Sequence, residues 1–478
     1  MNMNRRALYV LGVVGVLPAC PTLAQSLCGS EDAKVTPASV VTDDNFGASF
    51  DAAAAGFGVA GAINAGADGA GRAYIYAINP TVPQLQFELA PDDGASGDRF
   101  GASVAADNAW ALVGAPFQGE AGPAAGAAYL YLRSTGAQVD KLLASDGRGL
   151  DLFGGSLDID FDRAVVCASD KSSSTGAVYV FEIVGLDAVE RFKLTASDAA
   201  AVDRFGSAVS IDGGGVTAGE VGYALIGAIG NDDFGASSGS AYLFNIETGE
   251  ETAKLLPDDP AAGSQFGLEV ALLIEGDVAL AAVSADTNNP DGTNGSVYLF
   301  DVSDRSNPVQ LSKVTANDTL GVGDFGISVS LTSDTLLVGA LSGETTLAGT
   351  AYSFDISDPA NPVQSSIIRP GDAIPFARFG TATTLYQSPS ELRVFVGAPT
   401  ADSGDPAPGT VTTGALYALT VSGCRPDFDG DCLLTIFDFL AFQNLFDAGD
   451  LSADFDGDGD LTIFDFLAFQ NAFDAGCS

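Results

Sequence analysis

Short apolar runs separated by polar turns recur along most of the chain, and together they form one phrase that is repeated seven times. Each copy begins with Phe-Gly, continues with an apolar run of the Val-Gly-Ala type and ends in Gly-x-x-Tyr. The phenylalanines, which lie 52 to 61 residues apart, are Phe46, Phe100, Phe153, Phe205, Phe266, Phe325 and Phe379. The first two runs are apolar and the third alternates between apolar and polar positions, as buried and half-buried β-strands do.

A fourth run with strand-like composition follows most copies, for example residues 141–144 and 193–196. A fixed period of about 50 residues indicates a propeller, a solenoid or an array. Four strands make one propeller blade, so the seven repeats predict an all-β, seven-bladed β-propeller. Because a single blade cannot bury both faces of its sheet, the blades must stack on one another.

The two ends of the repeat array are incomplete in complementary ways. The seventh copy stops at residues 417–420 without a fourth run, whereas residues 33–37, before the first Phe-Gly, resemble the fourth run at 193–196. We therefore predict that strand 33–37 completes the seventh blade, so that the ring has no unpaired seam. The propeller domain is predicted to span residues 25–421.

These Phe-Gly and Gly-x-x-Tyr phrases, over residues 33–421, resemble FG-GAP repeats, the blades of the integrin alpha-subunit propeller and of many bacterial secreted proteins. Several integrin blades carry a calcium loop, Asp-x-Asp-x-Asp-Gly, between their first and second strands. The corresponding turns here are short, as at residues 106–108 and 333–334. The resemblance therefore implies the fold and no calcium sites within the blades.

The turns of the predicted propeller gather acidic residues on one face. The fourth-to-first connections are rich in Asp, and the second-to-third connections are long and rich in Gly, Asp and Asn. Both sets lie on the same face, which we expect to bind a glycan or a protein. The alternative is that turns simply require these residue types. Pairs such as Asp198 and Asp203 have the chemistry of a glycosidase acid and base, but every blade has such a pair.

The pattern changes after Gly423. Residues 434–444 and 461–471 are the same eleven residues, LTIFDFLAFQN, and each copy follows an acidic loop. The runs 436–446 and 463–473 read as short helices. Residues 422–478 are therefore predicted to form a small α-helical domain that contains two tandem calcium loops.

Each acidic loop has the ligand spacing of an EF-hand, with oxygen donors at positions 1, 3, 5 and 12 and a backbone carbonyl at position 7. The predicted ligands of two calcium ions are Asp427, Asp429, Asp431, the Leu433 carbonyl and Asp438 in the first loop, and Asp454, Asp456, Asp458, the Asp460 carbonyl and Asp465 in the second. Position 6, where the chain turns sharply, is Gly459 in the second loop and Cys432 in the first. A side chain is disfavoured there, so we expect the first site to be strained or weaker. The alternative is an acidic turn repeat without metal.

Two loop–helix halves with a period of 27 residues resemble a dockerin of the Cys-flanked type that ends in Gly-Cys. The resemblance covers residues 424–477 and implies a bond between Cys424 and Cys477. It also implies that loop positions 10 and 11 face a cohesin-like or cell-surface partner. These positions are Ile436 and Phe437 in the first half and Ile463 and Phe464 in the second. Such apolar pairs suit a hydrophobic partner surface, and the alternative is that they pack the two helices together.

The first 24 residues have the features of a secretory signal peptide. Arg5 and Arg6 precede an apolar core, residues 7–17, that is too short to span a bilayer, and Thr22-Leu23-Ala24 provides a small-residue cleavage site. The sequence thus predicts a secreted protein at the cell surface or outside the cell. It has no other segment long and apolar enough to span a membrane.

Removal of this signal leaves five cysteines, an odd number, so at least one thiol stays unpaired. Cys28 precedes the closing strand and Cys424 follows its predicted neighbour. A Cys28–Cys424 bond with Cys432–Cys477 is therefore an alternative to the pairing that the resemblance implies. Cys167 occupies the Gly position of a Val-Gly-Ala run and is expected to be a buried thiol.

Charge and composition narrow the function. With 62 acidic and 20 basic residues the formal net charge is −42, which argues against nucleic acid and anionic membranes as partners. The chain has no histidine, which excludes a Ser-His-Asp triad and imidazole zinc sites. We expect a secreted, non-catalytic binding or adhesion protein that is anchored or assembled through its calcium-dependent C-terminal module. The alternative is a dockerin-bearing enzyme that degrades polysaccharides with carboxylates.

Overall fold

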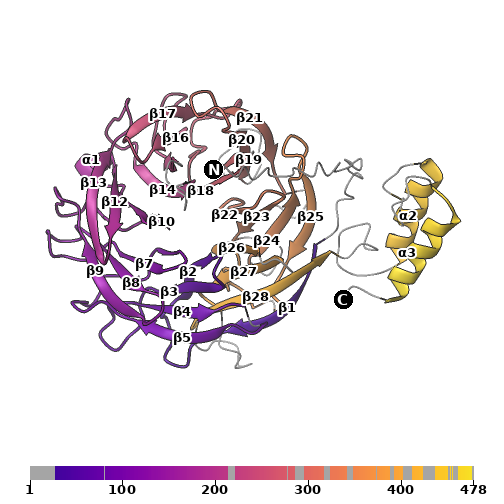
Figure 1. Ribbon diagram of the computed structural model, residues 1–478, viewed down its shortest axis with the longest axis horizontal. Coiled ribbons are helices and arrows are strands. Elements are labelled where there is room, and N and C mark those ends of the chain that lie inside the picture. Colours follow the sequence, from indigo (N-terminus) through magenta and orange to yellow (C-terminus); the bar gives the residue numbers. More distant parts are fainter. Residues whose placement is uncertain are drawn as a thin grey trace, which may run out of the picture.

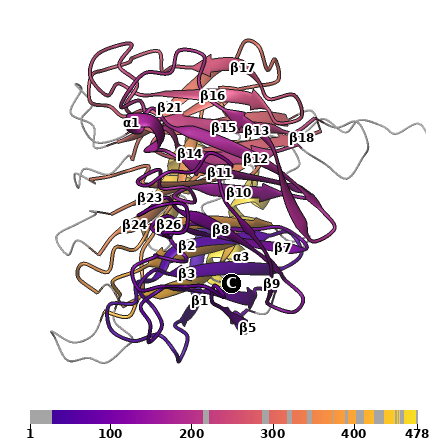
Figure 2. The ribbon, with the colours of Figure 1, turned by 90° about the vertical axis from the view of Figure 1, so that its left-hand side faces the viewer.

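The structure is a computed structural model. It describes residues 27–79, 81–213, 221–276, 278–285, 295–316, 323–341, 348–372, 374–387, 392–401, 412–423, 436–449, 453, 455 and 461–475. In this part of the chain, seven four-stranded antiparallel sheets form a ring (Figure 1). Seen from the side, the strands cross the thickness of the ring and loops extend from both of its faces (Figure 2). The all-β, seven-bladed architecture predicted from the repeats is confirmed.

The first four sheets follow the order of the sequence from the innermost strand outwards. They contain β2 (Phe46–Ala53), β3 (Phe57–Ala62), β4 (Arg72–Ala77) and β5 (Gln84–Leu89); β6 (Val104–Ala106), β7 (Trp110–Ala115), β8 (Ala127–Leu132) and β9 (Ala137–Leu142); β10 (Leu157–Asp160), β11 (Arg163–Ala168), β12 (Ala177–Val184) and β13 (Asp187–Leu194); and β14 (Phe205–Asp212), β15 (Tyr223–Ala228), β16 (Ser240–Asn245) and β17 (Glu250–Leu255). A single turn, α1 (Lys171–Ser174), lies between β11 and β12.

The fifth and sixth sheets have the same order, but the seventh takes its outer strand from the beginning of the chain. These sheets contain β18 (Val270–Glu275), β19 (Val278–Ala285), β20 (Ser296–Asp301) and β21 (Val309–Val314); β22 (Ser328–Leu331), β23 (Thr335–Ala340), β24 (Thr350–Asp355) and β25 (Val363–Ile368); and β26 (Ala382–Gln387), β27 (Leu392–Ala398), β28 (Ala415–Gly423) and β1 (Leu27–Val35).

The outer strand of the seventh sheet, β1, runs antiparallel to β28, with Lys34 opposite Tyr417 and Val35 opposite Leu416. It begins earlier than the expected strand 33–37 and ends before Pro37. Proline has no backbone N–H to donate to a neighbouring strand, which explains why the ladder stops there. The chain therefore closes its own ring, with its first and last strands in one sheet.

The repeated Gly and Phe residues connect neighbouring sheets. In six of the seven Gly-x-x-Tyr phrases the glycine bridges to the phenylalanine that begins the next sheet, as Gly126 does to Phe153 and as Gly414 does to Phe46 across the closure. A Cβ atom on Gly126 would lie 2.0 Å from the Phe153 carbonyl oxygen, and the φ of Gly126 is +87°. Only glycine tolerates both the close approach and this left-handed backbone.

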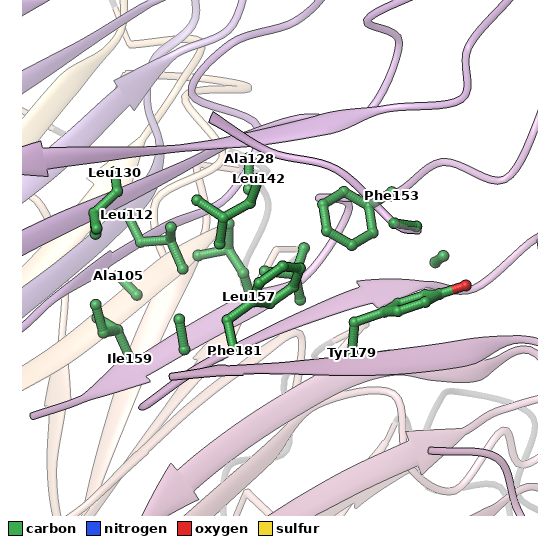
Figure 3. Packing of buried hydrophobic residues seen from close by; sticks show 14 of the residues in the cluster. Ala105, Leu112, Ala128, Leu130, Leu142, Phe153, Leu157, Ile159, Tyr179 and Phe181 are labelled. Carbon is green, nitrogen blue, oxygen red and sulfur yellow. The ribbon is translucent and has the colours of Figure 1, made fainter. Parts of the chain in front are cut away.

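The hydrophobic core lies between neighbouring sheets. Figure 3 shows Leu112, Leu130 and Leu142 of the second sheet next to Leu157 and Phe181 of the third. Within each sheet the phenylalanine of Phe-Gly meets the tyrosine of Gly-x-x-Tyr edge-on, and the Phe153 and Tyr179 ring centroids are 5.5 Å apart. The recurring aromatic residues therefore build the core.

Two helices follow the propeller, α2 (Ile436–Ala448) and α3 (Ile463–Ala475). They pack through Phe442 and Phe469, which are both buried and lie at equivalent positions of the duplicated sequence. The two rings are stacked, with centroids 4.1 Å apart and an interplanar angle of 4°. Ala453 and Phe455 complete this small core. In the described part of the chain, no helix has the length and apolarity needed to cross a membrane.

Candidate functional site

The acidic fourth-to-first connections are held by a repeated contact between sheets. Asp259 accepts hydrogen bonds from the Tyr298 hydroxyl at 2.8 Å and from the Lys313 ammonium at 2.7 Å. The Lys313 nitrogen also lies 5.4 Å from the centroid of the Tyr298 ring. Five sheets share this arrangement, and the carboxylate, hydroxyl and ammonium are supplied by Asp93, Tyr129 and Lys141; Asp146, Tyr179 and Lys193; Asp198, Tyr242 and Lys254; Asp259, Tyr298 and Lys313; and Asp372, Tyr417 and Lys34.

The pair considered as a glycosidase acid and base, Asp198 and Asp203, is engaged in this scaffold. Partial burial opposes ionisation of Asp198, but hydrogen bonds from Lys254 and Tyr242 outweigh it and lower its pKa. Asp203 is 3% exposed and accepts the Ala200 backbone N–H at 2.7 Å. Burial is the main reason that the pKa of Asp203 is raised. These contacts favour the interpretation that the loop carboxylates shape the turns.

The same face carries strained, exposed apolar residues that the pattern of apolar and polar positions did not single out. Leu150, Val202 and Phe376 each lie three residues before a Phe-Gly phrase, with φ angles of 69°, 76° and 63°. Their side chains are 68%, 60% and 65% exposed. Glycine fills the same position at Gly97 and Gly263, where φ is also positive. A branched or bulky side chain in the left-handed region costs about 1–2 kcal/mol and marks a position to examine for function.

Most of the predicted calcium ligands lie outside the described residues, namely Asp427, Asp429, Asp431, Leu433, Asp454, Asp456, Asp458 and Asp460. The cysteines Cys424, Cys432 and Cys477 lie outside them too, as does the predicted signal peptide, residues 1–24. Among the residues that are described, no three acidic, Cys or His side chains stand together in a way that suits a metal ion. The calcium sites, the disulfide pairing and the signal peptide stay predictions.

The two closing carboxylates of the loops are described, and both are fully buried in the first turn of a helix. Asp465 accepts the Phe455 N–H through Oδ1 and the Thr462 N–H through Oδ2, each at 2.7 Å. The Thr462 hydroxyl in turn accepts the Phe464 N–H at 3.1 Å. Thr462 and Asp465 thus cap the helix reciprocally, which holds the carboxylate against the backbone of its own loop. A carboxylate is the type of ligand that calcium prefers, and Asp465 holds the closing position of the predicted loop.

The four predicted partner residues are exposed. Ile436 and Phe437 are 62% and 65% exposed, and Ile463 and Phe464 are 62% and 64% exposed. Leu440 and Leu467, one helical turn further on, are 45% and 46% exposed, so they extend the two surfaces. The helices pack together through other residues, chiefly Phe442 and Phe469. We call the trio Ile436, Phe437 and Leu440 the first apolar face and the trio Ile463, Phe464 and Leu467 the second.

The geometry defines a closed, seven-sheet propeller built from one repeated unit. The profile of the FG-GAP repeat matches residues 84–131, 137–181, 189–244, 250–300 and 308–354, just over half of the chain. The chain therefore belongs to the FG-GAP repeat family. No curated protein matches the chain.

The matched segments are out of phase with the sheets. Each match begins at the outer strand of one sheet and ends at the third strand of the next, as residues 84–131 do from β5 to β8. Every matched segment is thus shared between two sheets. In such an arrangement the last sheet takes its outer strand from the start of the chain, and β1 is that strand.

Proposed function

We propose that this chain is a secreted, non-catalytic binding protein. Its FG-GAP propeller is a rigid disc that carries a ligand, and residues 422–478 attach it to a cohesin-like or cell-surface partner in a calcium-dependent manner. The observation that carries this proposal is the pair of exposed apolar faces on α2 and α3. Phe437 and Phe464 are exposed at equivalent positions of the duplication, although Phe442 and Phe469 of the same two helices are fully buried.

The apolar faces suit a protein partner more than a soluble glycan. Each face groups three large apolar side chains within two turns of one helix. Burial of a side chain such as Phe against a partner contributes about 1.5–3 kcal/mol, and few residues usually dominate such an interface. Because the faces are copies, either could dock the same partner in opposite orientations.

Calcium has a defined role in this proposal. The buried carboxylates Asp438 and Asp465 lie in the first turn of the helix that follows each acidic loop, and Asp465 is bonded to the backbone of its loop. Calcium bound to such a loop would neutralise the clustered carboxylates and fix the first helical turn. That turn carries positions 10 and 11, so metal binding and presentation of the apolar faces are coupled.

The duplication leads to a specific expectation for mutants. Phe437→Asp or Phe464→Asp alone should weaken binding to an immobilised cohesin by no more than about twofold, because the other face remains. The double mutant should lose about 3 kcal/mol or more, which is over a hundredfold in affinity. Surface plasmon resonance with and without a calcium chelator measures both effects, and the chelator should abolish binding by the unmutated chain.

Leu150→Asp provides the matched control, because Leu150 is equally exposed but lies on the propeller. It should bind the cohesin as the unmutated chain does. Equal binding by the double mutant and this control would contradict the role of the apolar faces. Chain that takes up no calcium in titration calorimetry would contradict the metal-dependent part of the proposal.

The strained residues on the loop-rich face support a ligand site there. Val202→Gly should raise the free energy of unfolding by about 1 kcal/mol, because glycine adopts a φ of 76° without strain. Denaturant unfolding measures this gain. If the exposed side chain contacts a ligand, the same mutant should bind less to the glycan and protein arrays that the unmutated chain recognises.

Val309→Gly is the control for this mutant. Val309 is also exposed, at 52%, but it begins the regular strand β21. There the same change should lower the free energy of unfolding by about 0.5–1 kcal/mol. A Val202→Gly protein that is no more stable than the unmutated chain would rule out strain at this position.

A further inference from the structure

A cavity of about 370 Å³ lies at the centre of the ring, between the first strands of all seven sheets. Serine hydroxyls on its lining tie four of the sheets to the next one. Ser49 donates to the Gly101 carbonyl at 2.9 Å and Ser103 to the Gly154 carbonyl at 2.8 Å. Ser49 and Ser103 lie three residues after the Phe of their Phe-Gly phrases, and their hydroxyls are part of the scaffold.

Three carboxylates depart from this pattern. Asp51 and Asp158 lie five residues after Phe46 and Phe153, and Glu269 lies three residues after Phe266. Each aspartate uses one oxygen to accept a backbone N–H of the next sheet, from Ala106 and Ile211 respectively, at 2.8 Å. No Lys or Arg lines the cavity in the described part of the chain. The ionisable side chains that line the cavity are therefore all acidic.

Glu269 is the carboxylate without a structural task. It takes the place of Ser49, while Ser284 takes the place of the strand-two glycine beside it, Gly61. The Ser284 hydroxyl accepts the Glu269 backbone N–H at 2.9 Å within the fifth sheet, and this bond does not use the Glu269 side chain. Among the described residues the carboxyl group has no hydrogen-bond partner, and it lines the cavity. Burial alone raises its pKa to about 8.

The aspartates are held in a similarly unfavourable environment. Burial raises the pKa of Asp51 to about 6. Burial also raises the pKa of Asp158 well above its usual range, and the charge of Asp51 adds to that shift. An arriving cation would relieve both the desolvation and the mutual repulsion.

The arrangement of the carboxylates selects the kind of cation. No three described carboxylates are close enough together to hold a metal ion. Glu269 is two residues out of step with Asp51 and Asp158 along the first strands, which is about 7 Å at the rise of a β-strand. The other residues that line the cavity are uncharged. Two acidic levels separated by an uncharged stretch match two ammonium groups joined by methylenes.

We propose that the central cavity binds a linear aliphatic diamine, with one ammonium on Glu269 and the other between Asp51 and Asp158. This site is independent of the helices and of the calcium loops. A diamine site would also explain why the fifth sheet has Ser284 and Glu269 where the first sheet has Gly61 and Ser49, since this difference places a carboxylate in the cavity.

Titration calorimetry of the full chain with 1,4-diaminobutane tests the proposal. The buffer should contain physiological salt and saturating calcium, so that the acidic C-terminal loops do not compete for the amine. We expect one diamine per chain, and about tenfold weaker binding of 1-aminobutane, which has one ammonium. Glu269→Gln should weaken diamine binding about tenfold or more.

Asp187→Asn is the matched control, because it removes the same charge from an exposed hairpin. It should bind as the unmutated chain does. If Glu269→Gln does not fold, Glu269→Ser replaces it, since serine occupies this position in other sheets. Absence of binding heat, or equal loss in the Glu269 and Asp187 variants, would overturn the site and leave only diffuse attraction to a net charge of −42.

Discussion

A chain that lacks residues 27–38 will melt roughly 10 °C or more below the full chain, or lose its cooperative transition. The deletion removes β1, which pairs with β28 along its whole length. It also removes Lys34, whose ammonium lies 2.6 Å from Asp372 at the boundary between the last two sheets. The β28 edge would then be unpaired, and the contact between the last two sheets would lose its outer support. Differential scanning calorimetry measures the change.

Re-attachment of the strand is the decisive control for this deletion. Leu27 lies opposite Gly423, so β1 can follow β28 directly through a short hairpin turn. A chain that carries residues 27–38 after Gly423, joined by such a turn, should recover most of the lost melting temperature. Deletion without effect, or failure of the re-attached strand to restore stability, would show that β1 does not hold the ring closed.

The number and order of the sheets could be predicted because each repeat contains the same residues at similar spacing and forms the same contacts. A phenylalanine and a tyrosine about 26 to 38 residues apart must meet in one sheet, and the glycine before the tyrosine must approach the next phenylalanine. Local periodicity and turn residues were sufficient to recognise the strands. The seventh repeat lacks a fourth strand and an extra strand precedes the first repeat, which indicated that the N-terminal strand completes the last sheet.

The roles of individual polar residues were harder to predict, because they depend on contacts between repeats. Asp198 and Lys254 are 56 residues apart, yet they form an ion pair at 2.5 Å. From the sequence, Asp198 is one of many turn aspartates. The strain at Val202 is equally hidden, since its φ of 76° follows from the closing geometry of the loop and not from its neighbours in sequence.

At the C-terminus the sequence predicted more than the structure describes. The ligand spacing predicts two calcium loops, and of the predicted ligands only the buried closing residues Asp438 and Asp465 are described. The structure distinguishes between two roles for the apolar pairs, which are packing of the two helices and exposure to a partner. Phe442 and Phe469 join the helices, and Phe437 and Phe464 stay on the surface. Helical periodicity alone could not decide this, because both helices are apolar on several sides.

The ring closure contains one buried cation that no pattern of the sequence distinguished. Arg393 on β27 is fully buried and reaches the segment between β4 and β5 of the first sheet. It donates to the Thr81 carbonyl at 2.6 Å and to the Ile78 carbonyl. Asp32 of β1 lies 3.7 Å away, and the guanidinium carbon lies 5.2 Å from the centroid of the Phe395 ring. One side chain therefore connects the first sheet, the last sheet and the closing strand.

Replacement of this cation should be among the most destabilising single changes in the propeller. Arg393→Met keeps most of the volume but leaves Asp32 and two buried carbonyls without the guanidinium, so we expect a loss of about 3–5 kcal/mol in the free energy of unfolding. Arg393→Lys keeps the charge but not the planar fork, and should lose less. Denaturant unfolding measures each loss.

A double-mutant cycle with Asp32→Asn identifies the cause. If the buried charge of Asp32 is a large part of the cost, Asp32→Asn should recover about 1 kcal/mol or more in the Arg393→Met background, although it is destabilising by itself. Purely additive losses would show that the cost comes from the Ile78 and Thr81 carbonyls instead. A loss below about 1 kcal/mol in Arg393→Met would mean that Arg393 does not pin the closure. Because these contacts join the two ends of the array, the same mutation should also make the loss of β1 less costly, since both act on one seam.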